Sequence, residues 1–216
     1  MHCPFCHNST IISTTINDVS PKNSSSLGET LNLIGETDVF SFLKSRIGKL
    51  DGVCITGGEP TLQSDLKYFI KEIKDMGFLV KLDTNGTRPE IIQELIDAGL
   101  IDYIAMDIKN SLDKYDITSG LRDFDTSKIL KCIGVIIQSG IEHEFRTTIV
   151  RNYHTEDDIR RICTTIKGCK AYYLQKYIDR ESVLDRRCEA IPDSIMRSYL
   201  EIAREQIPNT YLRGVE

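Results

Sequence analysis

Residues 50–63 of this chain read LDGVCITGGEPTLQ. The apolar run at 52–56 is followed at once by two glycines, Glu59 and Pro60, and then by a helical pattern of apolar residues at 63–76. A short run rich in Val and Ile that ends at a glycine turn predicts a strand, and apolar residues three and four apart predict an amphipathic helix. The stretch therefore predicts one strand–turn–helix unit.

The same unit recurs along the chain. Further strands are predicted at 79–84, 103–108, 144–150 and 171–177, and helices at 89–98, 127–139, 156–166 and 193–206, with a first helix from Glu36. Strands that alternate with helices predict parallel βα units joined by right-handed crossovers. We therefore expect an α/β fold, either a partial or complete βα barrel or an open doubly wound sheet.

Length and composition favour one domain without a nucleic-acid or membrane partner. The 216 residues carry a net charge of -5, and Lys and Arg are scattered among Asp and Glu instead of forming a basic stripe. The longest apolar runs are too short to span a bilayer. We expect a single cytoplasmic domain over 1–216, which divides into a loop at 1–8, a polar surface loop at 9–35, βα repeats over 36–177, and a C-terminal helix and tail over 178–216.

A cysteine pair stands at the start of the chain, in Cys3-Pro4-Phe5-Cys6. Two thiolates separated by two residues can hold one metal centre from a single loop, so the pair fits a zinc half-site, an iron–sulfur half-site or a redox dithiol. The odd total of seven cysteines favours reduced thiols over a disulfide framework. Cys54, Cys132 and Cys163 lie in apolar patterns and are predicted to be small core residues.

Polar motifs follow the predicted strands at their C-terminal ends, the face on which βα barrels build sites. They are Gly57-Gly58-Glu59-Pro60, Asp83-Thr84-Asn85-Gly86, Asp107 with Lys109, Arg146-Thr147-Thr148, and Gln175. Side chains two apart in a strand share a face, and a charged pair on an inward face is costly unless it meets a ligand or another charge. Each motif alone fits a turn or a surface ion pair, but together they indicate one ligand site.

In combination these motifs resemble the radical S-adenosylmethionine (SAM) enzymes. The resemblance is closest to the activating proteins of anaerobic ribonucleoside-triphosphate reductases, with pyruvate formate-lyase activating enzyme more distant. It extends from Cys3 to about Tyr177 and is carried by 50–63, 80–86, 102–109, 144–148 and 173–175. The fold that it implies is a partial (β/α)6 TIM-type barrel.

The chain departs from the family at its N-terminus. The family's cluster loop is C-x3-C-x2-C, and Cys3 and Cys6 match its second and third cysteines, so the first would lie one residue before Met1. The barrel strand that should precede this loop is missing as well. We therefore expect Met1 to be an internal methionine of a longer chain.

The resemblance implies an enzyme that activates a glycyl radical enzyme, anaerobic ribonucleotide reductase, with electrons from a one-electron donor such as flavodoxin or ferredoxin. A [4Fe-4S] cluster and SAM would generate a 5′-deoxyadenosyl radical that installs a glycyl radical on the partner. Cys3 and Cys6 would be metal ligands. The residues that would surround SAM are Gly57, Gly58 and Glu59 at its amino group, Asp107 and Lys109 beside the ribose and carboxylate, Arg146 near the methionine end, and Phe5, His7 and Gln175 near the adenine. Asp83, Thr84 and Asn85 complete this set, and the first two match positions where relatives hold a monovalent cation.

Two other functions fit parts of the sequence. The absent first cysteine fits a truncated or degenerate βα domain that binds a ligand or partner without catalysis. A radical SAM enzyme that acts on a small molecule is the other alternative. The stretch after Tyr177 is short for a dedicated substrate domain, which favours a large protein substrate.

Overall fold

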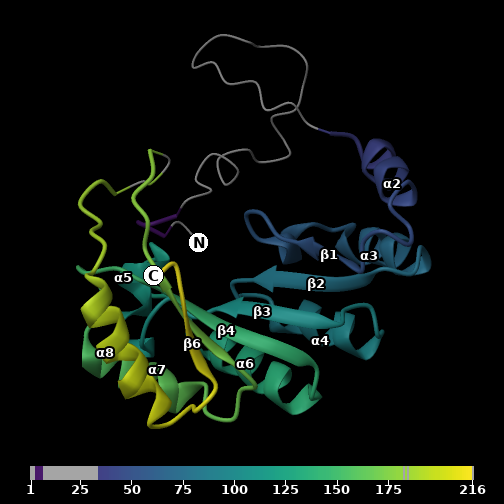
Figure 1. Cartoon of the computed structure of the whole chain (residues 1–216). Helices are drawn as coiled ribbons and strands as arrows, with labels where there is room; N and C mark the ends of the chain where they lie inside the picture. Colours follow the sequence, from purple (N-terminus) through teal and green to yellow (C-terminus); the bar gives the residue numbers. More distant parts are fainter. Residues whose placement is uncertain (1–2, 7–33, 182, 184, 216) are drawn as a thin grey trace.

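The computed structural model describes residues 3–6, 34–181, 183 and 185–215. Within these residues six parallel strands form one sheet in the order β1-β2-β3-β4-β5-β6 (Figure 1). The strands are β1 (Gly52–Ile55), β2 (Leu79–Thr84), β3 (Tyr103–Asp107), β4 (Glu142–Ile149), β5 (Tyr172–Lys176) and β6 (Thr210–Arg213). Each strand pairs with its neighbour in sequence, and the two outer strands do not pair with each other in the described part, so the barrel is partial and open.

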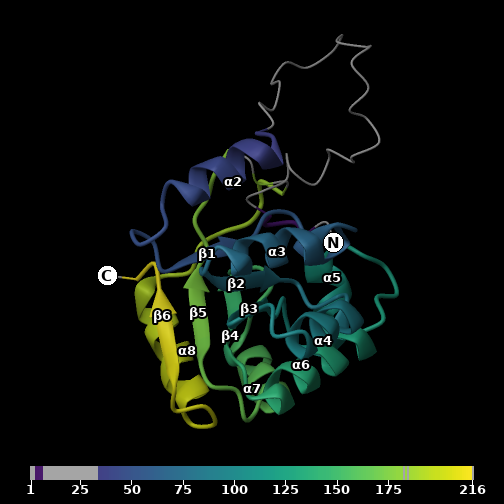
Figure 2. The same cartoon turned by 90° about the vertical axis from the view of Figure 1, so that its right-hand side faces the viewer.

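Helices connect the strands and cover one face of the sheet (Figures 1 and 2). They are α2 (Glu36–Lys44), α3 (Leu66–Asp75), α4 (Pro89–Asp97), α5 (Tyr115–Ser119), α6 (Ser127–Ser139), α7 (Glu156–Thr165) and α8 (Asp193–Arg204), with 3-10 turns at Pro60–Leu62 and Leu112–Lys114. Of the described helices that are at least eight residues long, α7 alone has a full capping box, in which Thr155 and Asp158 satisfy each other's backbone N–H groups.

Alternation along the strands separates an apolar face from a polar one. In β2, Val80 and Leu82 are fully buried in the core between sheet and helices, whereas Lys81 and Asp83 point to the opposite, inner face. The inner faces of β3 and β4 likewise present Asp107 and Arg146. One side of the sheet therefore builds the hydrophobic core, and the other collects charged groups.

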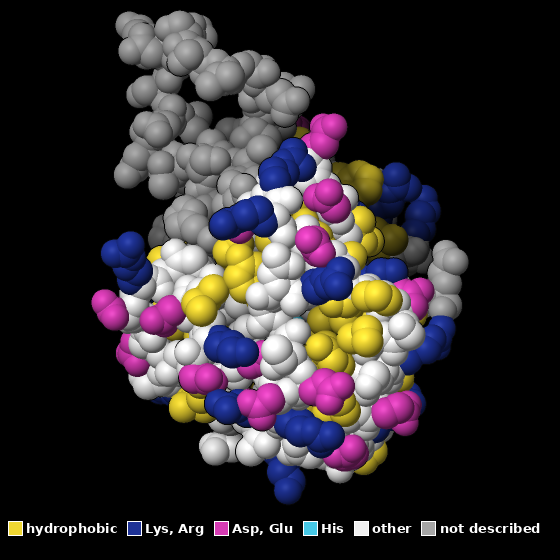
Figure 3. Space-filling view, turned by 90° about the vertical axis from the view of Figure 1, so that its left-hand side faces the viewer, with side chains coloured by type: hydrophobic (Ala, Val, Ile, Leu, Met, Phe, Trp, Pro, Cys, Tyr) yellow, Lys and Arg dark blue, Asp and Glu magenta, His cyan; other side chains and the backbone are white. Residues whose placement is uncertain are grey.

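The outer surface near the C-terminal helices carries both signs of charge in close alternation (Figure 3). Surface ion pairs there include Arg160 with Glu205, which joins α7 to the end of α8. No helix in the described part of the chain is long and apolar enough to cross a membrane.

The partial TIM-type barrel predicted from the sequence is confirmed, and the bounds predicted at 79–84 and 127–139 are those observed. Four elements were missed: the 3-10 turn at Pro60–Leu62, α5, the 3-10 turn before α5, and β6, which occupies part of the predicted C-terminal tail. The helix predicted from residue 63 begins at Leu66, because a separate 3-10 turn follows the glycines. The predicted surface loop at 9–35 lies almost wholly outside the described residues.

The prediction for the core cysteines is right for two of them and wrong for the third. Cys132 and Cys163 are buried, but Cys54 is exposed. Cys54 lies on the inner face of β1, an edge strand of the described sheet, where its neighbours are the charged groups of Lys81 and Asp83. The apolar run that contains it packs only Val53 and Ile55 against the core.

Candidate functional site

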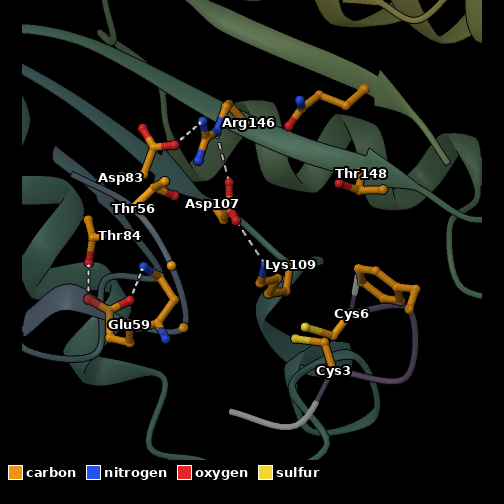
Figure 4. A pocket seen from close by; sticks show the side chains of 15 residues that line it. Cys3, Cys6, Thr56, Glu59, Asp83, Thr84, Asp107, Lys109, Arg146 and Thr148 are labelled. Atoms are coloured by element: carbon orange, nitrogen blue, oxygen red, sulfur yellow. Dashed lines mark hydrogen bonds and ion pairs between the residues drawn. The ribbon is translucent and has the colours of Figure 1, made fainter. Parts of the chain in front are cut away.

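A cavity of about 300 Å³ lies at the C-terminal ends of the strands (Figure 4). Its walls contain every predicted site residue that the structure describes, namely Cys3, Phe5, Cys6, Gly57, Gly58, Glu59, Asp83, Thr84, Asn85, Asp107, Lys109, Arg146 and Gln175. His7 lies outside the described residues. Five strands and the N-terminal loop therefore contribute to a single site.

Two further residues of the cavity, Thr56 and Thr148, were not among the residues expected to surround SAM, although Thr148 belongs to one of the polar motifs. The sequence did hold a signal for each. Thr148 is two residues after Arg146 and so shares its inner face, and Thr56 directly precedes the glycine turn at the end of β1. Thr148 is paired in register with Gln175 of the next strand, so their side chains lie side by side on the cavity wall.

The two thiols lie together on one side of the cavity (Figure 4). A backbone hydrogen bond of 3.1 Å from Cys6 N–H to the Cys3 carbonyl closes the loop that carries them. Cys3 is only 6% exposed, and this burial raises the pKa of its thiol, although the nearby Lys109 ammonium acts in the opposite direction. Among the described residues, no third His, Cys, Asp or Glu side chain joins the pair in a metal-binding group.

The carboxylate of Glu59 is hydrogen-bonded to neighbouring protein groups. Its Oε1 accepts hydrogen bonds from the Thr61 hydroxyl at 2.6 Å and the Thr84 hydroxyl at 2.8 Å, and its Oε2 accepts one from Asn85 N–H at 2.7 Å. A weaker contact from Thr61 N–H, at 3.3 Å, also reaches Oε1. Glu59 therefore links the glycine turn after β1 to the turn after β2, and its carboxylate is already largely satisfied by protein donors.

Four charged side chains form a chain of alternating sign across β2, β3 and β4 (Figure 4). Arg146 donates to Asp83 at 3.1 Å and to Asp107 at 2.9 Å, and Lys109 donates to the other oxygen of Asp107 at 3.0 Å. The charged side chains that the sequence places on the inner face therefore form ion pairs with one another, which offsets the cost of burying them. Both oxygens of Asp107 are engaged, and the guanidinium of Arg146 is held between two carboxylates.

These contacts shift the pKa values of Asp107, Lys109 and Arg146 in the direction that keeps each of these three groups charged. Burial acts to raise the pKa of Asp107, but Lys109 and Arg146 outweigh it and lower that pKa below its usual range. Burial acts to lower the pKa of Lys109, and Asp107 outweighs it and raises that pKa. The cavity therefore presents fixed positive and negative groups near neutral pH.

One oxygen of the Asp83 carboxylate differs from the other carboxylate oxygens of these four charged side chains. Asp83 Oδ1 is buried and accepts no hydrogen bond from the described residues, while the Lys81 ammonium lies 3.5 Å away in an ion pair. A buried anionic oxygen without a donor is costly, so it is a place where an additional cationic group would be favourable.

A second charged cluster lies on the same inner face of the sheet, nearer the N-terminal ends of the strands than the cavity. Glu144, whose side chain is only 3% exposed, accepts two hydrogen bonds of 2.8 Å from the guanidinium of Arg213 in β6 and one of 3.0 Å from the Tyr103 hydroxyl. Arg213 also lies over the ring of Tyr173, 3.7 Å from its centroid. Neither Glu144 nor Arg213 was singled out in the sequence, although Glu144 precedes Arg146 by two residues and so shares its face.

Comparison with known proteins gives a consistent result. Residues 1–166 match the family model described as the radical SAM superfamily. The whole chain aligns, at 35% identity over 222 positions and 85% of the relative's length, with a provisionally named glycyl-radical enzyme activating enzyme of Methanocaldococcus jannaschii.

The fold is also found in solved structures of other proteins. A domain of pyruvate-formate lyase-activating enzyme from Bacteroides vulgatus superposes with a TM-score of 0.63 at 18% identity, over 76% of this chain and 99% of that domain. The SuiB protein of Streptococcus suis, in a crystal structure with S-adenosylmethionine bound, superposes with a TM-score of 0.71 at 14% identity, over 99% of this chain and 47% of SuiB.

Proposed function

Because the chain belongs to the radical SAM superfamily, we propose that it is a glycyl-radical-enzyme activase whose partner is an anaerobic ribonucleotide reductase. In that reaction SAM and one electron would supply the radical chemistry that removes a hydrogen atom from a glycine Cα of the partner. The products would be methionine, 5′-deoxyadenosine and a glycyl radical. The observation that supports this function best is the convergence of two thiols, the glycine turn and four alternating charges on one cavity.

Cys3 and Cys6 would supply two thiolate ligands to a [4Fe-4S] cluster. Two neighbouring thiols that face one cavity suit an iron–sulfur group, since thiolates are its usual ligands. When bound and reduced, by a donor such as flavodoxin or ferredoxin, the cluster supplies the electron for SAM cleavage. The protein's part is to hold SAM against the cluster and to exclude water from the site.

The glycine turn and the charged chain would bind the amino-acid end of SAM. Gly57 has a φ of 143°, a conformation that other residues rarely adopt, so the turn brings bare backbone to the cavity wall. Lys109 would pair with the SAM carboxylate, and Asp107 and Arg146 would hold Lys109 in place through their own ion pairs. Glu59 would act on the amino group mainly by fixing the turn, since its own carboxylate already accepts protein donors.

The acceptor Asp83 Oδ1 supports a further part of the proposal, a monovalent cation beside the SAM carboxylate. A cation there would give this oxygen a close contact in addition to the Lys81 ammonium, which lies 3.5 Å away without a hydrogen bond. The affinity for SAM should then fall when potassium and sodium are replaced by tetramethylammonium, a cation too large for the position. Equal affinity in all three salts would exclude the cation and leave the rest of the proposal standing.

Anaerobic reconstitution with iron and sulfide, followed by reduction with dithionite, tests the function directly. SAM cleavage to 5′-deoxyadenosine, together with a glycyl radical signal in the electron paramagnetic resonance spectrum of added reductase, supports the activase. Cleavage of SAM without a radical on any glycyl radical enzyme would favour a small-molecule substrate. A protein that takes up no iron and binds no SAM would be a non-catalytic binding domain.

Matched cysteine variants identify the ligands in the same experiment. Cys3→Ala and Cys6→Ala should each lower the iron content and abolish SAM cleavage. Cys132→Ala and Cys163→Ala should change neither, because both side chains are buried in the core away from the cavity. Loss of iron in Cys132→Ala with an intact fold would contradict the assignment.

A further inference from the structure

His154 is a buried histidine that the proposed chemistry does not use. It lies in the loop between β4 and α7, and only 2% of its surface is exposed. Its Nδ1 accepts a hydrogen bond of 3.1 Å from Val150 N–H, and its Nε2 lies 2.9 Å from the backbone carbonyl of Lys109. The imidazole therefore bridges the end of β4 and the segment that follows β3.

These contacts define the tautomer and the protonation state of the His154 ring. Because the Lys109 carbonyl can only accept, Nε2 carries a proton and donates to it, and in the neutral ring this leaves Nδ1 as the acceptor for Val150 N–H. The Val150 carbonyl also lies 3.3 Å from Nδ1, a longer contact that does not change this assignment. The ring must be neutral for this pattern, and burial favours that state by lowering the pKa of His154. Without the imidazole, Val150 N–H and the Lys109 carbonyl would both lose a buried partner.

The same ring also contacts the loop that carries the thiols. The ring of Phe5 meets His154 edge-on, with centroids 6.4 Å apart, and meets Tyr153 at 5.9 Å. Phe5 is 5% exposed and belongs to a small apolar cluster with Val150 and Tyr177. A backbone hydrogen bond of 2.9 Å from Asp185 N–H to the Pro4 carbonyl is a further tether of this loop.

Lys109 and the thiols lie near each other in the wall of the same cavity (Figure 4). His154 contacts the Lys109 carbonyl and the Phe5 ring, which support these two groups. Lys109 contributes to the shift in the pKa of Cys3, so the two groups are electrostatically coupled. A displacement of the Lys109 backbone or of Phe5 would change the distance between the Lys109 ammonium and the Cys3 thiol. The loop at 150–154 is reinforced by Asn110, whose side-chain amide donates to the Tyr153 carbonyl at 2.9 Å.

We propose that His154 is a positioning residue that fixes the Lys109 backbone and the Phe5 ring together, and so sets the placement of the thiol loop relative to the SAM-binding charges. The significance of these two groups for catalysis rests on the proposed function. The mechanical coupling itself is a property of the metal-free chain and can be measured without iron, SAM or a partner.

The chain offers a matched control in His143. It is also 2% exposed, and it also bridges two backbone groups, since its Nδ1 donates to the Ile141 carbonyl at 2.8 Å and its Nε2 accepts from Lys170 N–H at 3.2 Å. His143 lies at the start of β4, whereas His154 follows the end of that strand next to the cavity. The same substitution at the two positions therefore separates general destabilisation from an effect on the thiol loop.

The experiment compares His154→Phe with His143→Phe in the metal-free chain. Phenylalanine keeps the ring shape and removes both hydrogen bonds. The rate of alkylation of Cys3 by iodoacetamide is measured by mass spectrometry relative to the exposed Cys54 in the same molecule. We expect this ratio to rise at least about fivefold in His154→Phe, since even one of the two lost hydrogen bonds gives about that factor to a local opening equilibrium, and to stay unchanged in His143→Phe.

A second variant keeps the test decisive if His154→Phe folds poorly. His154→Gln retains an N–H that can reach the Lys109 carbonyl, so it should return the alkylation ratio to near the wild-type value. An unchanged ratio in His154→Phe, or an equal rise in both phenylalanine variants, would overturn the positioning role. If the ratio changes as expected but the reconstituted wild type cleaves no SAM, the coupling stands and the proposed function fails.

Discussion

The carboxylate of Glu59 joins the turn after β1 to the turn after β2, and this gives the side chain a structural role besides any contact with SAM. Glu59→Ala would leave Asn85 N–H and the Thr84 hydroxyl without their acceptor, so we expect the free energy of unfolding to fall by about 1–3 kcal/mol, measured in urea. Glu59→Gln keeps one carbonyl acceptor and should lose less.

The same pair of variants separates the two roles. Loss of SAM affinity in Glu59→Gln without loss of stability would mean that the carboxylate meets the SAM amino group directly. Parallel losses of stability and affinity would mean that the residue acts through the turn.

Lys109 differs from Glu59 because its ammonium is available at the cavity wall. Asp107 keeps Arg146 as a partner when Lys109 is removed, so Lys109→Met should fold nearly as well as the wild type. The Kd for SAM should rise about ten- to a hundredfold, the cost of one charge-assisted hydrogen bond, as measured by isothermal titration into reconstituted protein. Lys67→Met, which removes an exposed ammonium paired with Glu94, is the control. Unchanged affinity in Lys109→Met would place the SAM carboxylate elsewhere.

At the scale of the elements, β6 is held to the sheet by a charged contact as well as by its backbone. Arg213 pairs with the buried Glu144, and removing one member of such a pair leaves an expensive buried charge. Arg213 is 36% exposed, and Tyr103 and Lys81 remain near Glu144, which moderates the loss. We expect Arg213→Met to lower the free energy of unfolding by about 1–3 kcal/mol in urea denaturation.

The control for this prediction is Arg160→Met. Arg160 pairs with Glu205 on the surface, where a salt bridge contributes about 0–1 kcal/mol. Equal losses in the two arginine variants would show that the inner-face cluster contributes no more than an ordinary surface pair.

The elements also show what the sequence could and could not predict. Long strands and helices with regular apolar spacing, such as 79–84 and 127–139, were found at their observed bounds. The four residues of β6 contain too little pattern for such a prediction, and they become a strand only because β5 offers a free edge. Cys54 was misjudged for a related reason, since apolar spacing does not reveal that one face of an edge strand is uncovered.

The candidate site was more predictable than some of the elements that build it. Polar residues at strand ends meet wherever parallel strands share an edge, so their convergence follows from the βα order alone. Their partners do not follow from it. That Glu59 faces Thr84 and Asn85, or that Arg146 lies between two aspartates, depends on the register of neighbouring strands.

For the whole molecule, two neutral histidines buried near opposite ends of the sheet make stability depend on pH. Burial lowers the pKa of both His143 and His154 from the ordinary 6.5. Below pH 6.5 these two histidines therefore bind protons in the unfolded chain but not in the folded chain. Their contribution is complete above pH 6.5 and is lost as the pH falls towards the lowered pKa values. The acidic groups with lowered pKa values, such as Asp107, act in the same direction at lower pH.

Urea unfolding between about pH 7.5 and 5.5 should therefore show a free energy that falls on acidification, by up to about 1.4 kcal/mol per pH unit for each histidine. His143→Gln should remove about half of this slope and keep the site intact. A slope that is the same in wild type and His143→Gln would show that the histidines are not the groups that titrate.

The strand order has a consequence for how the molecule is assembled during synthesis. Because each strand pairs with the one made just before it, every βα unit can dock onto a preformed edge as it leaves the ribosome, without waiting for a distant segment. Of the six described strands, β6 is made last, and it carries Arg213. The carboxylate of Glu144 in β4 therefore has no Arg213 partner until β6 has docked. In ribosome-bound chains of increasing length, the amides of β2 to β4 should accordingly become protected from hydrogen exchange at shorter lengths than those of β6.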